Sequence, residues 1–149
     1  MLHSALLLVH LVCVVVWVGG MFFAYFCMRP AAVDVLAPAQ RLPLWVATFQ
    51  RFFRFAAVAV VLLMLTGLGM FSQVGFRYAP LGWNLMMALG LTMALVFTYV
   101  YAVAYPLLRK YCSATDWKLA GTVLNRIRKL VGINLVLATV VLIAAAFSR

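Results

Sequence analysis

The chain has 149 residues, of which 68% are hydrophobic and only 9% are charged. Soluble domains are about 45–50% apolar and about 25% charged, so a soluble fold could not bury this much apolar surface. Attraction to anionic lipid headgroups explains the formal net charge of +10 better than nucleic acid does. We therefore expect a membrane protein that lies in the lipid bilayer, with no nucleic acid partner.

Four stretches are long and apolar enough to cross the hydrocarbon, which takes about 20 residues per helix. None of them contains Asp, Glu, Lys or Arg. The runs are continuous, whereas an outer-membrane barrel needs short alternating strands. The first run is too long for a signal peptide, so we expect it to remain as a helix. The prediction is an all-α fold, an integral membrane four-helix bundle in one transmembrane domain, with spans at about residues 5–28, 55–76, 81–108 and 130–147.

The basic side chains predict how the bundle is oriented. Most of them lie in the first and third connections between spans, and only Arg77 and Arg149 lie on the other side. The positive-inside rule then places both termini outside, in a bacterial-type inner (plasma) membrane. The basic residues assigned to the cytoplasm are Arg29, Arg41, Arg51, Arg54, Arg109, Lys110, Lys118, Arg126, Arg128 and Lys129.

Prolines and turn residues mark the first two connections. The segment Ala31–Gln50 is rich in proline, so we expect it to break into short pieces, with the second helix starting inside Leu44–Phe55. The segment Ser72–Gly82 is short and contains a proline, which predicts a tight outer turn. The second and third helices are then antiparallel neighbours.

The last helix is expected to start before its apolar core. Ser113 and Asp116 have the spacing of a capping box, and Thr115 competes as the N-cap residue. We expect the helix to begin near Thr115 and to enter the membrane near Leu130.

Histidine occurs only at positions 3 and 10. His3, His10, Trp17 and Ala24 are spaced by two helical turns, so they form one stripe along the first helix. Ionisable residues within a membrane span usually face the bundle interior and mark a function. We therefore expect His10 to point inward in the outer half of the bundle.

The topology places sulfur side chains of other helices beside His10. Three methionines of the second and third helices are expected at the same depth, and Cys13 and two further methionines lie deeper. Thioether and thiolate ligands select Cu(I), and imidazole also suits copper. The candidate cofactor-binding residues are His10, Met70, Met86 and Met87, and the candidate metal ligands are these four together with His3 and Cys13.

Other roles for these residues stay open. Methionine is a common filler of apolar cores, and His10 could make a structural hydrogen bond to a neighbouring helix. His3 could bind Cu(II) with the terminal amine and two amides if the first turn is unwound. Haem b is the alternative cofactor for His10. Two histidines on one face of one helix cannot clamp a haem, so its second ligand would come from another helix or chain.

No catalytic residue is assigned, and enzyme activity is not expected. The spans contain no carboxylate for a proton relay, and Asp34 and Asp116 lie on the side opposite to the histidines. Polar residues within the spans are expected to form interhelical hydrogen bonds. These residues are Thr66, Asn84, Thr92, Asn134 and Thr139.

Three stretches carry a resemblance that extends over most of the chain: "LVHLVCVVVWVGGMFF", "RFFRFAAVAVVLLMLTGLGM" with its Thr66-Gly67 pair, and "LNRIRKLVGINLVLATVV". They resemble short, four-helix members of the CopD (copper resistance protein D) membrane-domain family. The resemblance implies a role in moving or tolerating copper across the inner membrane. In the first stretch it rests on His10, Trp17, Gly19 and Gly20, followed by Arg29-Pro30, which closes the helix.

A more distant resemblance is to the HemJ protoporphyrinogen oxidases, which have a histidine in the first helix and bind haem b. Those proteins have a lysine after a tryptophan early in a later helix. Here Trp83 is followed by Asn84, Leu85, Met86 and Met87. This departure argues against the oxidase activity and leaves haem binding open.

The sequence therefore predicts an inner-membrane protein that handles copper, by transport, homeostasis or delivery, through a His/Met site in the outer half. The alternatives are a haem-b redox protein that uses His10 as axial ligand and a non-catalytic subunit of a larger membrane complex. Four helices make a thin transport pathway, so a homodimer, a larger complex or a periplasmic copper protein is an expected partner.

Overall fold

The computed structural model describes residues 1–74 and 81–147. Most of the predicted outer turn, with Arg77, and the terminal Arg149 lie outside these residues. The described chain contains four helices long and apolar enough to cross a membrane, which confirms the all-α four-helix prediction. The elements are α1 (Leu2–Phe22), η1 (Phe23–Met28), α2 (Arg29–Val35), α3 (Pro38–Val74), α4 (Leu81–Tyr99), η2 (Val100–Ala104), α5 (Tyr105–Ser113) and α6 (Trp117–Phe147).

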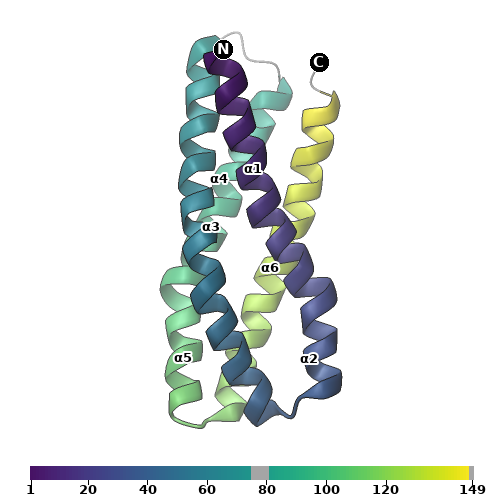
Figure 1. Ribbon diagram of the computed structural model, residues 1–149, viewed down its shortest axis with the longest axis vertical. Helices are drawn as coiled ribbons and strands as arrows, with labels where there is room; N and C mark the ends of the chain where they lie inside the picture. The colour runs from purple at the N-terminus through teal and green to yellow at the C-terminus, as the bar shows by residue number, and fades with distance from the viewer. Residues whose placement is uncertain (75–80, 148–149) are drawn as a thin grey trace.

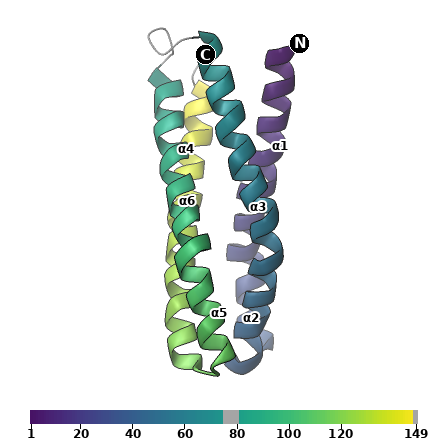
Figure 2. The same ribbon diagram turned by 90° about the vertical axis from the view of Figure 1, so that its left-hand side faces the viewer.

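The bundle consists of two pairs of helices packed against each other. α1 packs mainly on α3, and α4 packs mainly on α6 (Figure 2). α3 and α4 run antiparallel as predicted, but α4 packs more extensively on α6 than on α3. The outer surface is apolar, with Val15 71% exposed, Phe55 68% and Val136 65%. Such a surface suits contact with lipid acyl chains, because the backbone groups in the middle of each helix are bonded within that helix.

The start of α1 and the end of α6 lie at one end of the bundle, and the two basic segments meet at the other (Figure 1). α2 and the start of α3 bring the first basic segment there, and α5 and the start of α6 bring the second. We call these the terminal end and the basic end. That the basic end faces the cytoplasm stays a prediction from the positive-inside rule.

Two π-helical segments each lie just before a proline. Pro30 and Pro106 lack the N–H that would bond four residues back, to Phe26 and Ala102. In both helices the backbone hydrogen bonds at this point span five residues instead of four. In η1 the Arg29 N–H donates to the Ala24 carbonyl, and η2 has the same pattern. The prediction that Arg29-Pro30 closes the first helix is therefore wrong, because the π segment absorbs the proline and α2 continues to Val35.

The predicted break of Ala31–Gln50 occurs only at its centre. α2 ends at Val35, and α3 starts at Pro38 instead of inside Leu44–Phe55. Proline fits the first helical position, where its missing N–H has no intrahelical partner. Pro43 lies farther inside the helix, but its neighbourhood is exposed, so water can satisfy the one carbonyl that it leaves free.

α6 begins at Trp117, close to the predicted start, but its cap differs from both expected residues. The Asp116 carboxylate accepts a hydrogen bond from the Leu119 N–H at 3.0 Å. Ser113 instead donates to the Lys110 carbonyl, and Thr115 has a left-handed φ of 55°. Asp116 is therefore the N-cap residue of α6.

Candidate functional site

His10 is joined to α3 by a hydrogen bond between its Nδ1 and the Thr66 Oγ1, 2.9 Å apart. The Thr66 hydroxyl also lies 2.6 Å from the Leu62 carbonyl oxygen, to which it donates its one hydrogen. Oγ1 can then only accept from His10, so Nδ1 carries the imidazole hydrogen. The other nitrogen, Nε2, keeps a lone pair and has no hydrogen-bond partner among the residues described. A histidine held in this way is oriented to act as a metal ligand.

Glycine makes room for the ring on the α3 side. A Cβ atom at Gly67 would lie 3.6 Å from the His10 Cε1 atom, and one at Gly69 would lie 3.6 Å from Leu6 Cδ1. Both values are ordinary van der Waals distances, so the α3 backbone lies directly beside the residues of α1. Thr66 and Gly67 therefore both lie against His10, the first bonded to one ring nitrogen and the second next to the ring.

The His10 ring lines a cavity of about 400 Å³ in the terminal half of the bundle. Five of the chain's eight methionines also line it. The structure thus places five predicted ligands around one cavity, His3, His10, Met70, Met86 and Met87, while their role as ligands stays a prediction. Met64 and Met93, which we expected one to two turns deeper, line the same cavity.

Cysteine does not contribute to this cavity. Cys13 is 6% exposed and packs in the core of the bundle rather than in the cavity lining. Within the described ranges, no three His, Cys, Asp or Glu side chains come together to hold a metal ion. The donors around the cavity are therefore imidazoles and thioethers. His3 lies in the first turn of α1, so its predicted Cu(II) arrangement would require that turn to unwind.

The polar span residues behave differently from one another. Thr66 makes the predicted interhelical bond, and the Asn134 amide donates to the Met93 carbonyl at 3.2 Å, which joins α6 to α4. Thr92 and Thr139 bond only within their own helices, contrary to the expectation. A polar threonine in an otherwise apolar span indicated that Thr66 would form an interhelical hydrogen bond. Its partner could not be foreseen, because that depends on how α1 and α3 are rotated.

A chain of aromatic rings separates this cavity from the basic end. Trp17 lines the cavity, and its ring centroid lies 5.9 Å from that of Phe97. Phe97 lies 5.8 Å from Phe53, which stacks on Phe49 at 5.0 Å. All four side chains are buried. These rings therefore lie between the cavity and the residues of the basic end, where Phe49 lines a second pocket.

The fold and cavity define a class of protein, a multi-pass membrane bundle with a lining of soft, uncharged donors in one half. The chain belongs to the family of CopD, copper resistance protein D, whose family model matches residues 46–148. The match confirms the predicted resemblance and includes Thr66 and all five cavity methionines. His10 and the rest of α1 lie outside the matched residues. Neither the curated proteins nor the solved structures gave a match.

Proposed function

We propose that this protein handles copper and binds Cu(I), as its cargo, in the cavity between α1, α3, α4 and α6. The observation that carries the proposal is the state of His10, whose Nδ1 is bonded to Thr66 and which lines one cavity together with five methionines. The Nε2 atom and the thioethers of Met70, Met86 and Met87 are the proposed ligands. Membership of a copper-resistance family supports the choice of metal.

The donor set favours Cu(I) over divalent ions. Thioethers are soft ligands that select Cu(I), whereas carboxylates and water suit Mg²⁺ or Ca²⁺. Every proposed ligand is neutral, so a bound ion keeps its full charge inside an apolar bundle. Burying a single charge is far less costly than burying two, which also favours a monovalent ion.

The aromatic rings next to the cavity favour one side for copper entry. Trp17, Phe97 and Phe53 pack together on the side of the basic end, so we infer that copper enters from the terminal end. Under the predicted topology the terminal end is periplasmic, so a periplasmic copper protein or a second copy of the chain is a suitable partner. Storage and delivery need no further movement, whereas transport requires these rings to separate.

A Cu(I) competition titration of the purified protein in detergent tests the site. We expect His10→Ala to weaken Cu(I) binding at least about tenfold, since even the loss of outer-shell partners of metal ligands weakens binding by about 10–100-fold. Met86→Leu combined with Met87→Leu should act in the same direction while keeping side-chain volume. The matched control is Met21→Leu combined with Met28→Leu, two methionines outside the cavity lining.

Two outcomes would overturn the proposal. The first is equal Cu(I) binding by the wild type and by His10→Ala. The second is a Soret band in the visible spectrum of the purified protein that disappears in His10→Ala, which would make haem b the cofactor. Stoichiometric co-purification of a foreign subunit without bound copper would instead favour the structural-subunit alternative.

A further inference from the structure

Three of the ten arginines and lysines described at the basic end differ from the rest in burial. Arg29, Arg41 and Arg128 are half-buried, whereas the other seven are exposed. They come from α2, α3 and α6, which are distant in sequence. A long cationic side chain normally keeps its charged group in water. The positive-inside rule explains why these arginines lie at the basic end, but it does not explain why they are half-buried.

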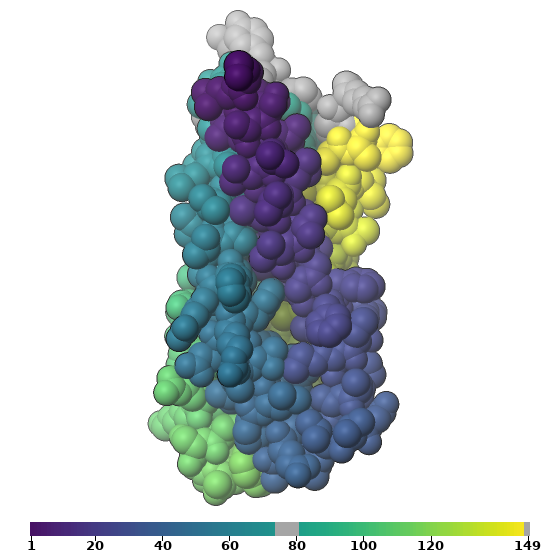
Figure 3. Space-filling view, viewed as in Figure 1, coloured from purple at the N-terminus to yellow at the C-terminus, as the bar shows by residue number. Residues whose placement is uncertain are grey.

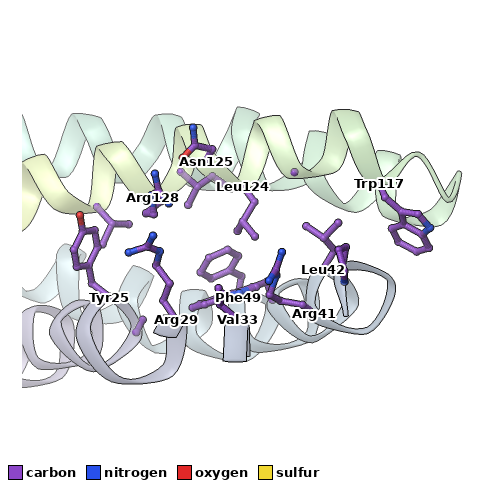
Figure 4. Close-up of a pocket in the computed structure, with 16 residues that line it drawn as sticks. Tyr25, Arg29, Val33, Arg41, Leu42, Phe49, Trp117, Leu124, Asn125 and Arg128 are labelled. Carbon is purple, nitrogen blue, oxygen red and sulfur yellow. The ribbon is translucent and has the colours of Figure 1, made fainter. Parts of the chain in front are cut away.

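The three arginines line one pocket of about 350 Å³. In the space-filling view, atoms of α6 are visible in a hollow between α3 and the segment that joins α1 to α2 (Figure 3). The close-up shows Arg29 reaching across toward the α6 side, where Arg128 and Asn125 lie, with Arg41 farther along the pocket (Figure 4). The Tyr25 hydroxyl points toward α6 in the same view. Apolar side chains, including Phe49, form the remaining walls.

No carboxylate of the described chain neutralises this pocket. Asp34 is exposed, Asp116 is used as the cap of α6, and neither lines the pocket. Within residues 1–74 and 81–147 no acidic group forms a salt bridge with any of the three arginines. Arg29 has only the face of the Tyr25 ring, 5.9 Å from the centroid. Three like charges that line one pocket repel one another, so an anion would stabilise this arrangement.

We propose that this pocket is a binding site for a phosphate group, held mainly by Arg29 and Arg128 from facing helices, with Arg41 as a third cation. The planar guanidinium group makes paired hydrogen bonds to phosphate oxygens, which suits two arginines from opposite walls. The Tyr25 hydroxyl, which points toward α6, supplies a further donor on the wall that carries Arg29. The site is separate from the cavity at His10 and does not depend on copper.

Two sources supply this chemistry. One is the headgroup of an anionic phospholipid, because the pocket lies at the end of the membrane helices, where headgroups are found. Its apolar walls would then contact the glycerol and the first part of the acyl chains. The other source is a soluble phosphate that enters from the aqueous side.

Thermal unfolding of the full chain in a neutral detergent tests the proposal, with tryptophan fluorescence as the signal because Trp45 and Trp117 line the pocket. The probes are phosphatidylglycerol, phosphatidylcholine and inorganic phosphate, each titrated separately. The pocket variant combines Arg29→Gln, Arg41→Gln and Arg128→Gln. The matched control combines Arg51→Gln, Arg54→Gln and Arg126→Gln, which removes the same charge from exposed positions.

We expect at least one anionic probe to stabilise the wild type, with an apparent affinity that falls about tenfold or more in the pocket variant and less than about twofold in the control. Stabilisation by phosphatidylglycerol alone identifies a lipid headgroup as the source. Stabilisation by inorganic phosphate identifies a soluble ligand.

Equal losses in the two triple variants would overturn the proposal, as would the absence of stabilisation by either anion. If the pocket variant does not fold, Arg128→Gln compared with Arg126→Gln answers the same question two residues apart on one helix. Here too, equal affinities would overturn the site.

Discussion

The two halves of the bundle contain cavities of similar size and opposite chemistry. The cavity in the terminal half, of about 400 Å³, is lined by histidine and methionine, whereas the pocket in the basic half, of about 350 Å³, is lined by three arginines. Neutral donors lie deep within the apolar spans, and permanent charges lie at the helix ends where headgroups and water begin. The comparison shows that the position along the membrane helices goes with the chemistry of the side chains that line each half.

The layer between the halves is aromatic. Phe53 is at its centre, with its ring centroid 5.0 Å from Phe49, 5.8 Å from Phe97 and 5.3 Å from Tyr105. Such edge-to-face and stacked contacts fix the rings more firmly than aliphatic packing does. The two cavities are therefore distinct sites held apart by one layer, and three substitutions test this separation.

Phe53→Ala should have the largest effect. The side chain is 4% exposed, and removing a buried phenyl ring costs about 3 to 5 kcal/mol of unfolding free energy. Phe55→Ala is the matched control, because that ring is 68% exposed toward lipid. Thermal unfolding in detergent measures both variants. Equal destabilisation by the two substitutions would show that the aromatic layer does not hold the bundle together.

Thr66→Val should have an intermediate effect, confined to the terminal half. It keeps the shape of the side chain but removes the oxygen that accepts from His10 Nδ1. Loss of such an outer partner weakens metal binding by about 10–100-fold. The control is Thr92→Val, since the Thr92 hydroxyl bonds only to its own helix at the Ala88 carbonyl. Unchanged Cu(I) affinity in Thr66→Val would contradict the proposed positioning of His10.

Gly20→Ala should have the smallest effect and tests the contact of α1 with α3. A Cβ atom at Gly20 would clash with the Phe52 ring, which would have to move, whereas one at Gly19 meets nothing within 4 Å. We expect Gly20→Ala to destabilise the protein by about 1 kcal/mol. Gly19→Ala should be neutral or stabilising by up to about 1 kcal/mol, because alanine favours helix. The reverse order in thermal unfolding would mean that α1 and α3 pack differently.

The four apolar helices and the gathering of histidine and methionine side chains around one cavity follow from the sequence for a simple reason. A run of apolar residues without charge, such as Ala5–Met28, has one stable form in a bilayer, and its helical spacing already aligns His3, His10 and Trp17. Depth along antiparallel helices then brings Met70 and Met86 to the level of His10. These inferences use only length and period, which are local properties of the chain.

The helix ends and the partners of single side chains were predicted less well. Pro30 and Pro43 do not end their helices, because a π segment absorbs the first and the exposed start of α3 tolerates the second. Asp116 rather than Ser113 caps α6. At a helix end, several hydrogen-bonding arrangements have nearly equal free energy. Residue type alone does not decide which of them forms.

The sequence by itself determined the class of this protein, its four spans and the family to which it belongs, because hydrophobic transfer and residue spacing act along one chain. Only the tertiary structure decided that Thr66 holds His10 and that Arg29 and Arg128 share a pocket. Both pairs join helices that are far apart in sequence. The physical reason is that the rotation and pairing of helices follow from packing over the whole bundle. Residues of distant helices are therefore brought together only when the helices are assembled.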